Sequence, residues 1–131
     1  MKNLNESSLI ARIWRGWTTA ENACAFEHKL ENEIFPAFAR KNMKGFKGAQ
    51  LLKNQHGNEI EFTTIMWFDS LLSLKNFAGE DYEAAHIDAD VEPLMLRYDT
   101  RSAHHFVSYS NFNNGGECAH KASSFQLRMW L

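Results

Sequence analysis

The 131-residue chain has only two cysteines and two prolines, no long apolar run and no excess of either charge. Two cysteines are too few for a disulfide framework, and we interpret Cys24 and Cys118 as reduced thiols. No stretch approaches the ~20 apolar residues that cross a bilayer, and the N-terminus lacks the apolar core of a signal peptide. A net charge of −2 and a pI near 6.3 do not attract nucleic acid or anionic lipid. We therefore expect a cytoplasmic protein with neither a membrane nor a nucleic-acid partner.

What is present suits one folded domain. The chain length and a hydrophobic content of 44% are enough for a single globular core. We assign residues 1–110 to this domain and residues 111–131 to a C-terminal tail of unknown role, because periodicity is lost at Asn-Asn-Gly-Gly. The Cys-Ala-His sequence at 118–120 has no second ligand pair at zinc-site spacing, so we predict no metal site.

Spacing and alternation of apolar residues predict six elements in the order strand, helix, strand, strand, helix, strand. The predicted elements are a strand at 9–17, a helix capped at residues 18–21 with an apolar stripe to Phe38, strands at 49–53 and 59–68, a helix from about residue 70 to Ala78, and a strand at 102–109. Pro36 predicts a kink or break of the first helix near Phe35. Residues 93–98 are predicted to form a short helical turn.

A βαββαβ order is typical of the ferredoxin-like plan, an α+β fold with one antiparallel sheet and helices on a single face. The other sheet face would then expose Trp, Met, Ile and Phe side chains, which is too large an apolar patch for a soluble monomer. A two-fold axis that brings two such faces together would cover both of them. We therefore expect a homodimer.

Five segments of the chain resemble a known family. They are IARIWRGWTT (10–19), GFKGAQLL (45–52), EFTTIMWFDSL (61–71), LKNFAGEDYEAA (74–85) and RYD (97–99). With them, residues 9–109 resemble the antibiotic biosynthesis monooxygenase (ABM) superfamily of small dimeric α+β barrels, and IWRGWT and FAGEDYE resemble one bacterial subgroup of it. Members of known function either oxidise aromatic polyketide-like substrates with O2 and no metal or flavin, or degrade haem.

The resemblance to the haem-degrading members extends to one of three site positions. His86 stands where those members have the axial histidine, after the second helix. Asn76 stands where they have a helical tryptophan, and Ala11 where they have a first-strand asparagine. The resemblance therefore implies no cofactor as the first expectation and haem, bound through His86, as the alternative.

Two arginines in the first strand point to an anion site. A strand covered on both faces does not tolerate an unpaired guanidinium, so either Arg12 or Arg15 should face a cavity and hold an anionic phenolate or carboxylate. The other should pair with a surface carboxylate from a helix. Strand parity does not separate the two, because a single bulge would reverse it. We take Arg12 as the anion-binding catalytic residue.

Two histidines are candidates for a catalytic base. His86 follows the acidic turn and is either a base, a haem ligand or an exposed loop residue. His104 and His105 lie on opposite faces of the last strand, so one of them should face the buried side, where it could accept a phenolic proton. The subgroup that the chain resembles has a histidine followed by an aromatic residue here, which favours His105. The predicted substrate-binding walls are Trp14, Trp67, Phe77 and Tyr82.

These observations lead to one hypothesis and two alternatives. The hypothesis is a cofactor-independent, monooxygenase-like homodimer that acts on a small phenolic or polyketide-like aromatic with O2. The first alternative is a protein that binds or degrades haem through His86. The second is a dimer without catalytic activity that binds a small molecule or is purely structural. The residues do not identify a substrate.

Overall fold

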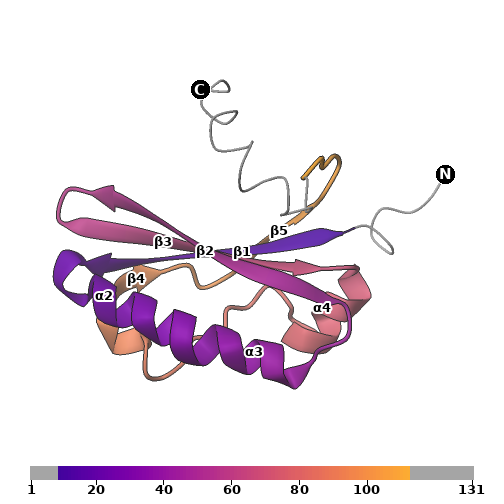
Figure 1. The fold of residues 1–131 in the computed structure, drawn as a ribbon, viewed down its shortest axis with the longest axis horizontal. Coiled ribbons are helices and arrows are strands. Elements are labelled where there is room, and N and C mark those ends of the chain that lie inside the picture. Colours follow the sequence, from indigo (N-terminus) through magenta and orange to yellow (C-terminus); the bar gives the residue numbers. More distant parts are fainter. Residues whose placement is uncertain (1–8, 113–131) are drawn as a thin grey trace, which may run out of the picture.

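A five-stranded antiparallel sheet carries all the helices on one face, as the computed structural model of the chain shows for residues 9–112 (Figure 1). The strands are β1 (Ile10–Thr19), β2 (Phe46–His56), β3 (Glu59–Phe68), β4 (Met95–Tyr98) and β5 (Ala103–Phe106). The helices are α2 (Ala20–Lys29), the π-helical turn η1 (Leu30–Ile34), α3 (Phe35–Lys41), α4 (Leu71–Ala78) and the 3₁₀ turn η2 (Glu92–Leu94). The strand order is β2-β3-β1-β4, and β5 also pairs with β1. The predicted ferredoxin-like α+β fold is confirmed.

The edge of the sheet beside β1 is made by two short strands in succession. β4 pairs with residues 16–18 of β1, and β5 pairs with residues 10–13. Residues 99–102 interrupt the edge between them. The predicted helical turn at 93–98 is therefore wrong beyond Leu94, because the backbone from Met95 onward is extended and pairs with β1. The predicted last strand at 102–109 shortens to β5.

The first helix does not break at Pro36. Thr19 caps its start, where the hydroxyl accepts a hydrogen bond from the Asn22 amide at 3.1 Å. A π-helical turn then follows, and α3 resumes with Pro36 in its first turn, where a missing amide donor costs little. The predicted kink near Phe35 is thus a wider helical turn. Such turns are frequent at functional sites, and this one lies beside the cavity described below.

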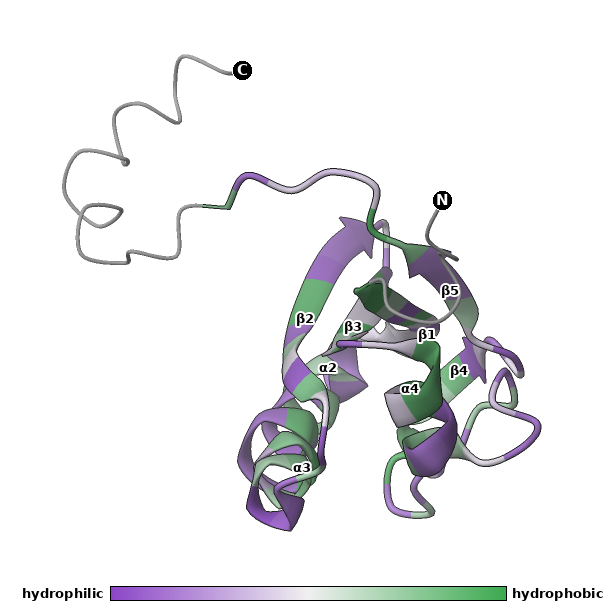
Figure 2. Cartoon of the chain, turned by 90° about the vertical axis from the view of Figure 1, so that its right-hand side faces the viewer, coloured by the Kyte–Doolittle hydropathy of each residue, from purple (hydrophilic) through white to green (hydrophobic). Residues whose placement is uncertain are grey.

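The core lies between the sheet and the helices, and it has two parts. One part packs Phe68 of β3 against Leu74 and Ala78 of α4, and the other packs Phe26 of α2 against Phe62 of β3, with ring centroids 4.7 Å apart. In the view turned by 90° from Figure 1, α3 and α4 lie at opposite sides of the same sheet face (Figure 2). Side chains of both helices line the cavity described below.

The other face of the sheet carries no helix among residues 9–112. Register places Ile13 beside Ile65, and Ala11 beside Trp67, on this open face. Leu52 of β2 lies on it too and is 46% exposed. The expectation that large apolar side chains line an uncovered face therefore holds for the described residues. Within the same residues, no helix is long and apolar enough to cross a membrane.

Candidate functional site

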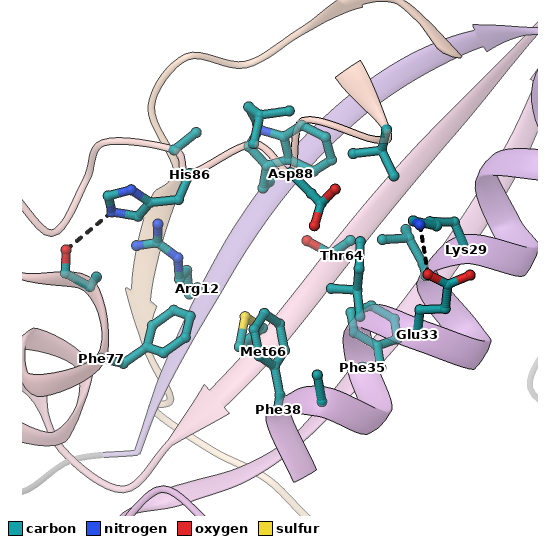
Figure 3. Close-up of a pocket in the computed structure, with 18 of the residues that line it drawn as sticks. Arg12, Lys29, Glu33, Phe35, Phe38, Thr64, Met66, Phe77, His86 and Asp88 are labelled. Carbon is teal, nitrogen blue, oxygen red and sulfur yellow. Dashed lines mark hydrogen bonds and ion pairs between the residues drawn. The ribbon is translucent and has the colours of Figure 1, made fainter. Parts of the chain in front are cut away.

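A cavity of about 1030 Å³ opens between the sheet and the helices (Figure 3). Its walls come from β1, β3, the α2–α3 helix, the segment from α4 to Val91, and Ser102. About half of the lining residues are apolar, and those central to the site are Arg12, Trp14, Thr64, Met66, Phe35, Phe38, Phe77, His86 and Asp88. A largely apolar cavity with a few polar groups is the usual form of a small-molecule site.

Arg12 is the most deeply buried of the charged residues that line this cavity, and it is only 6% exposed. The other charged lining residues are Lys29, Glu33, Arg40, Lys41, Asp88 and Asp90. Nη1 donates to the carbonyl oxygen of Tyr82, and Nη2 donates to that of Ala84 at 3.0 Å. Nη1 also lies 3.0 Å from Nε2 of His104. No carboxylate in residues 9–112 forms an ion pair with it. Burial lowers the pKa of Arg12, yet a guanidinium stays protonated in proteins, so its charge is uncompensated by a counter-ion.

His104 is neutral, and its tautomer follows from its contact with Arg12. A guanidinium only donates, so Nε2 of His104 must be the acceptor and the ring proton must lie on Nδ1. Burial and then the neighbouring charge of Arg12 lower the pKa of His104 to about 4. Nδ1 is buried and has no hydrogen-bond partner among residues 9–112. The ring also meets the Tyr82 ring edge-on, with centroids 5.2 Å apart.

His86 lines the cavity near Arg12 and Phe77, and its side chain remains accessible to solvent. Its Nε2 lies 3.2 Å from the carbonyl oxygen of Ala78, which can only accept, so this nitrogen carries the proton. In the neutral ring the lone pair is then on Nδ1. His86 is thus a cavity residue with a free nitrogen that is suited to accept a proton.

Trp14 forms a cavity wall. Its indole N–H donates to the Asp99 carbonyl oxygen at 2.7 Å, so this donor is not available to a ligand. The ring lies across Gly16, where an added Cβ would come within 2.8 Å of both the indole and the Met95 sulfur. The glycine in the Arg-Gly-Trp sequence is therefore required by the close approach of the Trp14 indole.

Phe77 and Tyr82 hold Arg12 in different ways. Phe77 lines the cavity, and the Arg12 guanidinium carbon lies 6.0 Å from its ring centroid. Tyr82 packs beside the site through its ring and contributes its carbonyl oxygen, but its side chain does not line the cavity. Of the four predicted walls, Trp14 and Phe77 therefore face the cavity directly.

Two predicted site residues lie on the opposite sheet face, which corrects the sequence interpretation. Trp67 pairs in register with Ala11, and its N–H donates to Gln50 at 2.8 Å on the open face. It alternates with Met66 and Phe68, which both point toward the helices. His105 also pairs with Ala11 and is exposed. Neither residue lines the cavity that contains Arg12.

The structure decides between the two arginines. Arg12 faces the cavity, whereas Arg15 lies on the open face and pairs with Asp99 at 3.1 Å. Its carboxylate partner comes from the interrupted sheet edge, not from a helix as expected. Sequence reasoning did not select His104 or Asp88 for the site. Alternation alone shows that His104 and His105 face opposite ways, and the choice between them needs the register of β5 against β1.

These features define a ferredoxin-like α+β domain with a ligand-sized cavity between its sheet and its helices. No protein-family model matches the chain, and no curated protein matches it in sequence. Solved structures match it in fold. A putative antibiotic biosynthesis monooxygenase from Bacillus cereus superimposes with a TM-score of 0.59 and 11% identity, covering 80% of this chain and 98% of that one.

Two other structures are less similar. A dimeric ferredoxin-like protein from an uncultured marine organism has a TM-score of 0.47 at 11% identity, covering 87% of this chain and 99% of that one. SnoaB, a cofactor-independent oxygenase from Streptomyces nogalater, has a TM-score of 0.45 at 12% identity, covering 82% and 99%. The first of these three structures shares the fold of this chain. At such identities the likeness shows the fold, and the activity has to be argued from the cavity.

Proposed function

We propose that this protein binds a small anionic aromatic molecule and oxidises it with O2 without a metal or flavin, as a cofactor-independent monooxygenase. The observation that carries the proposal is the buried, uncompensated guanidinium of Arg12 inside a cavity with aromatic walls. Such a site favours a flat apolar molecule with one anionic oxygen. The resemblance to the ABM superfamily supports the choice of reaction.

The proposed chemistry uses the electrons of the substrate itself. Nδ1 of His86 removes a proton from a phenol or anthrone, and Arg12 stabilises the resulting anion. Electrostatic stabilisation is strong here because water is largely excluded from the guanidinium. The anion transfers an electron to O2, the two radicals combine, and loss of water leaves a new carbonyl group. One oxygen atom enters the substrate, the other leaves as water, and all four electrons come from the substrate.

The proposal is tested by measuring the O2 that the protein consumes with a panel of naphthols and anthrones as substrates. Two histidine variants, one at the cavity and one on the opposite sheet face, form a matched pair. We expect one O2 per substrate molecule and no effect of a metal chelator. His86→Gln should lower kcat by about 10²- to 10⁴-fold, the usual contribution of a general base. His105→Gln should leave kcat unchanged, because His105 is exposed on the opposite face. Equal rates for both variants would remove His86 as the base.

Haem is the alternative cofactor, and the residues present do not fit it. Nε2 of His86 is already bonded to the carbonyl oxygen of Ala78, so ligation through this nitrogen requires that bond to break. Asn76 lines the cavity where the resemblance expects tryptophan, and Ala11 is buried beside Trp67 and His105 on the other face. Titration with haemin is therefore expected to give no Soret shift that depends on His86. A shift abolished by His86→Ala would favour the haem alternative.

We also propose that the protein is a homodimer that buries the open sheet face. The apolar side chains of Ile13, Ile65 and Leu52 on that face support this proposal, because a surface of this kind is costly to leave in water. A protein without catalytic activity that binds a small molecule remains the alternative from another class. This alternative is favoured if 2-naphthoate binds but the protein consumes no O2 with any of the aromatic substrates.

A further inference from the structure

We propose that His104 is a positioning residue that holds Arg12 at the cavity as a neutral hydrogen-bond acceptor, so that the guanidinium keeps its full charge for an anionic ligand. The inference rests on the proposed function of Arg12 as an anion site. His104 itself does not line the cavity, and it acts only through Arg12.

The surroundings of Arg12 are unusual for a buried guanidinium. Buried arginines are normally paired with a carboxylate, whose charge cancels theirs. Here the three acceptors within residues 9–112 are two backbone carbonyls and the imidazole of His104. All three fix the direction of the side chain, and none carries a negative charge. The position of Arg12 is therefore set without a counter-ion.

Carboxylates are close in sequence but are held elsewhere. Asp81 and Glu83 flank Tyr82, whose carbonyl binds Arg12. Both carboxylates instead pair with Arg101 on the exposed side of the segment, at 2.6 Å and 3.4 Å. The amide of Ser102 also donates to the Glu83 carbonyl oxygen at 2.6 Å, which fixes the backbone of the segment. This arrangement keeps the two acidic side chains beside Tyr82 engaged away from Arg12. Asp88 lines the same cavity but forms no ion pair with Arg12 in the described part of the chain.

Geometry also requires the imidazole to stay neutral. Protonation would turn Nε2 into a donor facing another donor and would place two cations 3.0 Å apart. The charged or titratable groups that act on the ring are Arg12, Glu83 and His105, and burial of the ring outweighs the attraction of Glu83. A neutral ring accepts the Arg12 hydrogen bond at the expense of leaving Nδ1–H unpaired, which is far less costly than an unpaired charge.

The test compares two ligands of the same shape, 2-naphthoate and 2-naphthamide, which differ in charge. Wild type should bind the anion about tenfold or more tightly than the amide by calorimetry. His104→Gln keeps a neutral acceptor and should retain this preference within about threefold. His104→Glu supplies an acceptor with a negative charge, and it should reduce naphthoate affinity by about 10- to 100-fold while binding naphthamide as before.

Each outcome separates the inference from the proposed function. If wild type shows no preference for the anion, the proposed anion site fails. If wild type shows the preference and His104→Glu retains it, or if both variants lose affinity for both ligands equally, His104 has only a packing role and the inference fails. Nitrogen NMR of the His104 ring in wild type needs no ligand and no variant. The inference requires a neutral ring with its proton on Nδ1 at pH 7, and an imidazolium or an Nε2–H tautomer would overturn it.

Discussion

Replacing Arg12 with methionine is expected to lower the affinity for 2-naphthoate by about 10- to 100-fold, because a hydrogen bond to a charged group contributes about 1.5–3 kcal/mol. The free energy of unfolding should also fall, by about 2–4 kcal/mol. Methionine fills much of the same space but leaves the carbonyl oxygens of Tyr82 and Ala84 without their donor. Calorimetric titration measures the first effect and urea unfolding measures the second.

Arg15 provides the matched control on the same strand. Its guanidinium pairs with Asp99 on the open face, away from the cavity. Arg15→Met should therefore leave naphthoate binding unchanged. Arg12→Met is also expected to keep the elution volume of the dimer, because Arg12 lies on the face away from the proposed interface. If Arg12→Met lowers naphthoate and naphthamide affinity equally, Arg12 is only a structural brace.

The free energy of unfolding is expected to rise with pH between about 4 and 6.5, with His104 as a main contributor. The folded protein holds the pKa of His104 at about 4, whereas the unfolded chain has the ordinary value of 6.5. Between these values the unfolded state binds more protons, so acid favours unfolding. The stability that comes from neutral His104 is complete above pH 6.5 and is lost as the pH falls toward 4. The shift in the pKa of His104 corresponds to a change of about 1–3 kcal/mol in the free energy of unfolding, and the lower figure allows for solvent screening.

Urea unfolding of wild type and His104→Gln at several pH values measures this effect. Protonation of carboxylates whose pKa is lowered by ion pairs, such as Asp81 beside Arg101, also lowers the free energy of unfolding in acid. This effect is equal in both proteins. The difference between the two curves therefore isolates His104. The difference in the free energy of unfolding between wild type and His104→Gln should narrow by about 1–3 kcal/mol from pH 7 to pH 4. Parallel curves would mean that His104 titrates normally in the folded protein.

The sequence was sufficient for most of the fold because the long elements have strong patterns. The alternation in β1 and β3 and the apolar stripe of α2 and α3 are each sustained over at least ten residues. β4 has only four residues, and a proline precedes it, so local preference favoured a helical turn. Its extended conformation is set by pairing with β1, which is a tertiary effect.

The sequence predicted site residues only where the prediction did not depend on strand register. The cost of burying a guanidinium identified Arg12 and Arg15 as candidates, but parity between them needed the register of β1 against β3. The same parity places Trp67 outside the cavity, because Met66 and Phe68 take the inward positions. The choice of His105 over His104 rested on the family resemblance, and only the register of β5 against β1 shows which of the two histidines faces the helices.

That interruption of the sheet edge bears on how a ligand reaches the cavity. Residues 99–102 bind the segment beside the site through two backbone hydrogen bonds, from the Ala85 amide to the Thr100 carbonyl and from the Ser102 amide to the Glu83 carbonyl. Together these two bonds form the bridge between Ala84 and Arg101. Arg12 fastens the same segment from inside. Movement of residues 82–85 away from the cavity would break all of these hydrogen bonds at once. We therefore expect a ligand to enter past α3, where Phe38 packs against Phe77 of α4.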